Sequence, residues 1–256
     1  MQRARRLAST AVVAVLAVSG LSACRTDPGV AAYVGSSTIS EQTVQEIFAD
    51  AQAKVDAQLD QARAAQRANP DPAQQPVPDE VKLGLTRANV VQTLVGVRVF
   101  KSIAEQRKVQ PTAVQPAQVA EQFGLPPGAR YVEAFAEYQG YLNALLDSAR
   151  SATLTDAEQR EVFRRFSSVN GPGDAMTYEQ FQNELLTPEN RQVLERTYGL
   201  RQDLRAATDK ADIRVNPRYG VQELPLLPVP TREGGQLSLV GLPVSGDSAP
   251  VVTDLS

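Results

Sequence analysis

Apolar side chains recur at steps of three and four residues through most of this chain, and that spacing constrains its fold more than any other feature. The first such stripe consists of Val44, Ile47, Phe48, Ala51, Val55, Leu59 and Ala62. Residues three and four apart share one face of an α-helix. The spacing therefore predicts a long amphipathic helix, and similar stripes further along predict a mainly α fold.

Helix start signals accompany these stripes. Ser40 precedes the first one, and its hydroxyl can accept a hydrogen bond from an amide of the first helical turn. Thr155 and Glu158 have the spacing of a capping box, which Thr177 and Gln180 repeat. Further helices are expected at residues 81–108, as a buried central helix, then at 116–123 and 130–151, and from Pro188 to about residue 208.

The first 23 residues have the form of a secretory signal peptide. Arg3, Arg5 and Arg6 make a short basic region, and residues 7–23 carry no charge and end in small side chains. A short apolar core of this kind is typical of a cleaved signal peptide rather than of a membrane span. We expect residues 1–23 to be removed on export.

The signal peptide ends in Leu21-Ser22-Ala23-Cys24, which resembles the lipobox of bacterial lipoproteins. Cys24 is the only cysteine in the chain, so it cannot form an intramolecular disulfide. Its thiol can form a thioether to diacylglycerol. We expect lipid on Cys24, with acyl chains such as palmitate, and residues 24–29 as a lipidated N-terminus and linker. The protein is then held at the extracytoplasmic face of the cell membrane.

The net charge and the missing residue types exclude several classes of function. The formal net charge is −3 and becomes −6 when the three arginines of residues 1–23 are removed. This mild acidity argues against nucleic acid as a partner. The chain has no histidine, which excludes Ser-His-Asp and Cys-His catalysis, and a lipidated Cys24 leaves no thiolate for zinc. We expect a protein that is not an enzyme and has no catalytic residue, cofactor or metal site.

The C-terminal part changes in character. Residues 213–215 alternate like a short strand. From residue 221 to residue 256, prolines, glycines and polar residues predict a flexible tail without a core of its own. A chain cut after Gly220 is therefore expected to lose little stability.

The two ends of the helical region resemble the SurA/PrsA type of folding factor. Residues 30–34, then Ile39-Ser40 and a long helix, are similar to the opening of that family's chaperone domain, and residues 211–220 are similar to its closing strand. The resemblance implies a multi-helix, SurA N-terminal-like domain over residues 30–220, with a small two-stranded clasp from the chain ends. It also implies that this chain lacks the family's parvulin-type isomerase domain, because that site uses histidines and residues 105–180 have a helical pattern.

The resemblance implies binding of non-native exported polypeptides in an apolar groove between helices. Five aromatic residues are candidates for that surface, with core packing as the alternative: Phe123, Tyr131, Phe135, Tyr138 and Tyr141. A second hypothesis is a structural or adaptor lipoprotein that binds one specific envelope protein. A prolyl isomerase or other enzyme conflicts with the missing histidines, and a solute-binding lipoprotein would need two α/β lobes.

Lipid attachment can be tested by replacing Cys24 with serine. Cys24→Ser should leave unprocessed precursor or a released soluble form, because the hydroxyl cannot accept the thioether-linked lipid. Because one acyl chain holds a protein only marginally, two or three chains are expected on this residue. Membrane fractions washed with carbonate and blotted for the protein and its size measure this, and a Ser variant that is cut to mature size yet still sediments with membranes would refute the assignment.

Overall fold

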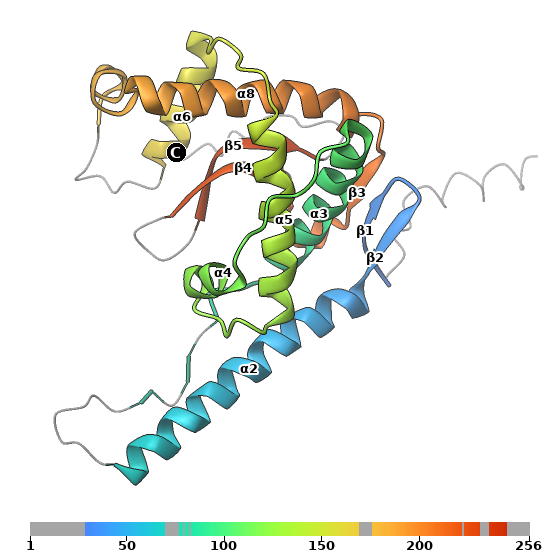
Figure 1. Cartoon of the computed structure of the whole chain (residues 1–256), viewed down its shortest axis with the longest axis vertical. Coiled ribbons are helices and arrows are strands. Elements are labelled where there is room, and N and C mark those ends of the chain that lie inside the picture. Colours follow the sequence, from blue (N-terminus) through green and yellow to red (C-terminus); the bar gives the residue numbers. More distant parts are fainter. Residues whose placement is uncertain are drawn as a thin grey trace, which may run out of the picture.

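The computed structural model describes residues 29–69, 77–168 and 176–244, apart from residues 79, 82, 222 and 231–235. The predicted signal peptide, Cys24 and the linker up to residue 28 lie outside the described residues. The described part is mainly helical, with small antiparallel sheets (Figure 1).

Helix α2 (Glu41–Ala68) begins where Ser40 predicts it. The Oγ of Ser40 accepts a hydrogen bond from the amide of Thr43, 3.0 Å away. The buried residues of α2 end at Val55. Its second half extends away from the other helices (Figure 1). Of the predicted stripe, all residues up to Leu59 are therefore buried or pack against the core, whereas Ala62 is exposed.

Helix α3 (Arg87–Arg107) is the buried central helix that the sequence predicts. It begins at Arg87 rather than at residue 81, because Thr86 and Asn89 form a capping box there. It packs along α5 (Arg130–Asp147), and α4 (Pro116–Phe123) packs against α5. These three helices form the centre of the molecule.

The remaining helical segments also follow their start signals. They are α6 (Asp156–Ser167), α7 (Tyr178–Gln180), the π-helical turn η3 (Phe181–Leu185) and α8 (Pro188–Thr208). The capping boxes predicted at Thr155 and Thr177 are both present. Thr187 caps α8, with Pro188 in its first turn.

The chain ends of the helical region meet in a sheet with strand order β2-β1-β3. Its strands are β1 (Val30–Val34), β2 (Ser37–Ser40) and β3 (Ile213–Val215). Ala32 pairs with Val215 and Val34 with Ile213, so the predicted clasp is present. It has three strands rather than two, because Gly35, at φ 57°, turns the chain back into β2.

The prediction of a flexible tail over residues 221–256 is wrong for residues 223–230 and 236–243. After the short helix η4 (Pro217–Tyr219), β4 (Glu223–Pro230) and β5 (Gln236–Pro243) form an antiparallel hairpin. Leu224, Leu226 and Leu242 are at most 1% exposed. The prolines are tolerated because β4 is an edge strand of a two-stranded sheet, where a missing amide hydrogen leaves little unpaired.

The hairpin packs against α3, α6 and α8, so it should be required for stability. One buried Leu→Ala change lowers the free energy of unfolding by about 2–5 kcal/mol, and Leu226→Ala should fall in that range. A chain ending at Gly220 loses the whole hairpin and should therefore be destabilised by well over that amount. Urea unfolding measures both. A chain ending at Val244 keeps every described residue and is the control; equal midpoints for the Gly220 and Val244 chains would contradict the packing.

Candidate functional site

A cavity of about 550 Å³ lies between α3, the α4–α5 pair and the β4–β5 hairpin. Its helical side carries four aromatic residues, Phe123, Tyr131, Phe135 and Tyr138. The hairpin adds Pro225, Pro228, Leu237 and Ser238. This aromatic cavity has the size and the mostly apolar lining of a typical ligand site.

The aromatic rings are fixed by contacts with one another. The ring of Phe123 lies edge-on to Tyr131 and Phe135, with centroids 5.1 and 4.8 Å away, and Phe135 stacks on Tyr138 at 5.4 Å. Such arrangements stabilise aromatic pairs beyond their buried area. The rings on the helical side of the cavity therefore hold one another in place.

The structure brings together four of the five aromatic candidates. Tyr131, Phe135 and Tyr138 are 2–6% exposed, so the core alternative holds for them, although each also faces the cavity. Phe123 is half-buried and is the most accessible ring of the lining. Tyr141 is half-buried on α5 and does not line the cavity.

The tyrosine hydroxyls act as neutral hydrogen-bonding groups. Thr93 donates to the hydroxyl of Tyr131, and Tyr138 donates to the carbonyl of Pro225 in the hairpin. Burial raises the pKa of Tyr131 to about 12 and also raises the pKa of Tyr138. Neither phenol can therefore serve as a base near neutral pH.

Polar side chains surround the rings. Asn89 and Gln92 come from α3, Gln122 from α4, and Glu223 and Ser238 from the hairpin. The side-chain amide of Gln92 donates to the backbone carbonyl of Glu223 at 2.9 Å. An apolar interior with an amide-bearing rim suits an apolar side chain whose own backbone remains at the mouth of the cavity.

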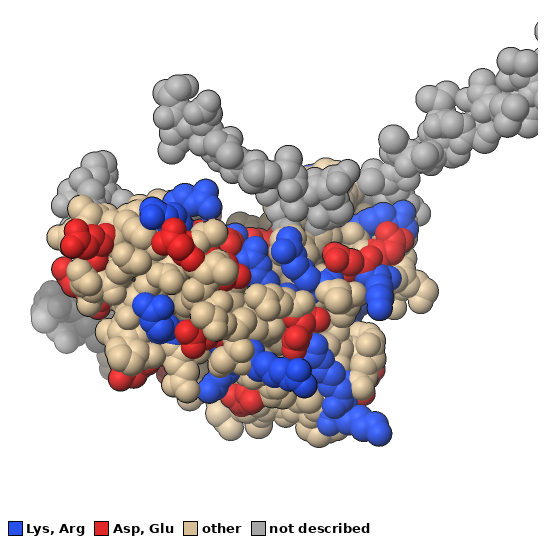
Figure 2. Space-filling view, turned by 90° about the horizontal axis from the view of Figure 1, so that it is seen from above, with Lys and Arg blue, Asp and Glu red and all other residues tan. Residues whose placement is uncertain are grey.

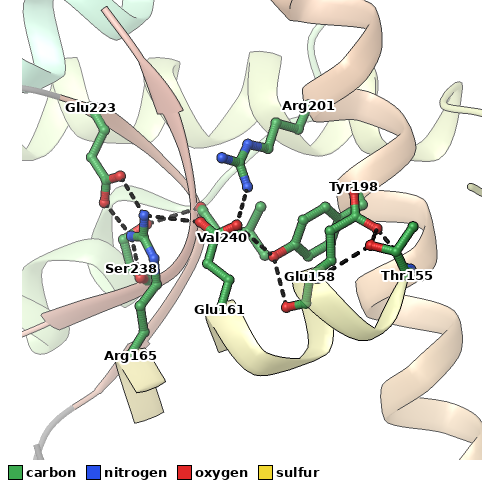
Figure 3. Close-up of polar contacts among 9 residues, drawn as sticks. All are labelled: Thr155, Glu158, Glu161, Arg165, Tyr198, Arg201, Glu223, Ser238 and Val240. Carbon is green, nitrogen blue, oxygen red and sulfur yellow. Dashed lines mark hydrogen bonds and ion pairs between the residues drawn. The ribbon is translucent and has the colours of Figure 1, made fainter. Parts of the chain in front are cut away.

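A charged network fastens the hairpin to α6 (Figure 3). Arg165 donates to both carboxylate oxygens of Glu223, at 2.6 and 2.8 Å, and to the carbonyl of Ser238 at 3.1 Å. Glu161 lies between Arg165, at 3.2 Å, and Arg201, at 2.9 Å. Planar, two-pronged Arg–carboxylate pairs are strong and directional. This network therefore holds both strands over the cavity.

Two members of the network, Glu161 and Arg165, are held in their ionised forms. Burial of Glu161 opposes its ionisation, but the hydrogen bond from Arg201 and the charges of Arg201 and Arg165 outweigh it and lower its pKa. The hydrogen bond to Glu223 raises the pKa of Arg165.

Sequence reasoning missed this network. The i,i+4 spacing of Glu161 and Arg165 is visible in the sequence and indicates a helical ion pair. Glu223, however, lies 58 residues beyond Arg165, in the segment predicted to be a tail.

Cys24, the predicted site of lipid attachment, lies outside the described residues, so its lipidation stays a prediction. Within the described ranges, no group of three or more acidic, histidine or cysteine residues could hold a metal ion. Nor does any helix described there have the length and apolar character to cross a membrane.

No protein-family model, curated protein or solved structure matches this chain. Its function therefore has to follow from its own residues and geometry.

The Glu161 pair gives a pH-dependent prediction. Because the folded-state pKa is lowered, ionised Glu161 stabilises the fold above its unfolded-state value of about 4.5, and this contribution is lost as the pH falls through the lower folded-state pKa. Glu161→Gln should therefore cost about 1–3 kcal/mol at neutral pH. Urea unfolding at several pH values should show the difference from wild type shrinking in acid.

The matched control is Glu195→Gln on α8, since Glu195 makes no ion pair within the described ranges. Its stability should differ little from wild type at any pH. A Glu161→Gln deficit that stays constant between neutral and acid pH would contradict the ionic account.

Proposed function

We propose that this chain is a lipid-anchored extracytoplasmic chaperone that holds apolar side chains of non-native exported polypeptides in the aromatic cavity. The observation that carries the proposal is the cavity of about 550 Å³, with four aromatic rings inside and amide side chains at its rim. Hydrophobic burial is non-directional, so such a cavity accepts different apolar side chains. Unfolded chains expose those side chains, whereas folded chains bury them.

The strength of binding fits a holding role. Burying one Leu or Phe side chain contributes about 1.5–3 kcal/mol. A single anchored side chain is therefore held weakly and released readily, which suits a chaperone that must return its client to folding. Asn89 and Gln92 line the cavity. One end of each amide is bonded to Thr86 or Glu223, and the other end can bond a client's backbone.

Two further hollows adjoin the cavity along α3, which offers more surface to a polypeptide than to a small molecule. A neighbouring cavity of about 360 Å³ shares Asn89, Gln92 and Glu223 with it and runs on past Gly220 and Val221. A third cleft shares Ala88 and Tyr219 with that neighbour. An extended segment can lie along such a path with one side chain in the aromatic cavity.

Two further observations support the anchored chaperone. The lipobox-like sequence at Cys24 stands shortly before β1, which begins at Val30, so lipid there keeps the clasp near the membrane. The pairing of β1 with β3 agrees with the terminal clasp of the SurA/PrsA type, which the sequence resembles. The missing histidines favour a member of that type without isomerase activity.

An adaptor that binds one envelope protein is the second candidate. The observation that favours it is the rigidity of the lining, where Tyr131, Phe135 and Tyr138 are nearly fully buried. Promiscuous binding surfaces are usually flexible, so a fixed lining selects fewer shapes.

The aggregation of a chemically denatured test protein distinguishes these functions. The mature chain should slow aggregation at near-stoichiometric ratios, and Phe123→Ala should weaken this by about tenfold or more because it removes the most accessible ring. Tyr141→Ala removes a half-buried aromatic outside the cavity and is the matched control. The light scattering of the test protein over time is the readout.

The same chain should not accelerate cis/trans exchange in a proline peptide assay. Measurable turnover there would refute the argument from the missing histidines. If no unrelated unfolded protein is held, while one envelope protein co-purifies in a fixed ratio, the adaptor function replaces the chaperone.

A further inference from the structure

A second cleft, distinct from the aromatic cavity, lies between the β1–β2 turn, the C-terminal half of α3 and the end of α8. Its volume is about 560 Å³. Three cationic side chains and three serine hydroxyls line it: Arg98, Lys101, Lys210, Ser36, Ser37 and Ser102. Glu105 is the one acid of this lining, so positive charge is in excess in this basic cleft.

The three cations differ from many others in this protein. Figure 2 shows basic and acidic side chains next to one another over one face, and Arg107, for example, pairs with Asp203 at 3.3 Å. Across the described ranges, by contrast, no side chain hydrogen-bonds or ion-pairs with Arg98, Lys101 or Lys210.

Arg98 is the most informative member of the cleft. Its side chain is half-buried, and burial lowers the pKa of Arg98. A charge removed from water without a partner is unfavourable, and a bound anion would offset that cost. The guanidinium and the nearby hydroxyls are donors whose geometry matches the oxygens of a phosphate group.

We propose that the basic cleft binds the phosphate of an anionic lipid headgroup at the membrane surface. The choice of a lipid rests on the proposed anchor at Cys24. A fully extended chain covers at most about 3.6 Å per residue, so Ser36 in the cleft lies within about 45 Å of the lipidated residue. An anchored chain therefore keeps the cleft within reach of headgroups, and their capture orients the clasp towards the membrane.

Vesicle sedimentation tests the proposal on residues 24–256 carrying Cys24→Ser, a chain that keeps every described residue. It should bind phosphatidylcholine vesicles that contain phosphatidylglycerol more tightly than vesicles of phosphatidylcholine alone. Each cleft charge removed should weaken binding about fivefold, so Lys101→Gln/Lys210→Gln should weaken it roughly twenty-fivefold. Arg98→Gln should weaken it without lowering the urea midpoint, because the removed charge has no partner.

Arg150→Gln/Arg164→Gln is the matched control, since it removes two exposed arginines outside the cleft. An equal loss in this control would show general attraction to a charged surface and overturn the proposal. If calorimetry detects binding of inorganic phosphate while the chain does not bind vesicles, the ligand of the cleft is a free anion. That result would overturn the proposal of a lipid headgroup. Phe123→Ala should leave vesicle binding unchanged. A failure of the lipid proposal can therefore be told apart from a failure of the proposed chaperone function.

Discussion

The contact between Tyr138 and Gly96 is the constraint on which the rest of the structure depends. A Cβ at position 96 would lie 2.3 Å from a ring carbon of Tyr138, so only glycine leaves room for the ring where α3 meets α5. The same ring packs on Phe100 at 5.3 Å, and its hydroxyl donates to the carbonyl of Pro225. One side chain thus joins α3, α5 and β4, which are three walls of the aromatic cavity.

The cavity exists because the C-terminal hairpin returns to the helices. Tyr138 holds β4 from the side of α5, and Arg165 holds it from α6 through Glu223. The buried face of the hairpin adds apolar contact with α3 and α8. The proposed binding site is therefore shared between the helical region and a segment that its composition alone would assign to a tail.

What the sequence predicts well is local. Ser40, Thr155 and Thr177 each cap the helix expected after them, because a cap depends on residues three positions away. The hairpin was missed because the prolines of β4 favoured the prediction of a tail. Leu224 and Leu226, two positions apart, were nevertheless a visible signal of a strand.

The residues of the candidate site likewise fall into two groups, those that local patterns predict and those that only tertiary packing brings together. The rings on α4 and α5 belong to helical stripes and were found in the sequence. The residues that cover them could not be found, since Tyr138 and Pro225 are 87 positions apart and only tertiary packing brings them together. The prediction of lipid on Cys24 rests on a local motif and needs no tertiary information.

Crosslinking in intact cells tests most directly whether non-native exported chains enter the aromatic cavity. A photoreactive residue at Gln122 stands at the rim, whereas one at Ala117 is exposed on the same helix outside the cavity lining. The account predicts adducts with many unrelated exported proteins from Gln122 and few from Ala117. Equal adducts from both positions, or one adduct species alone from Gln122, would contradict it.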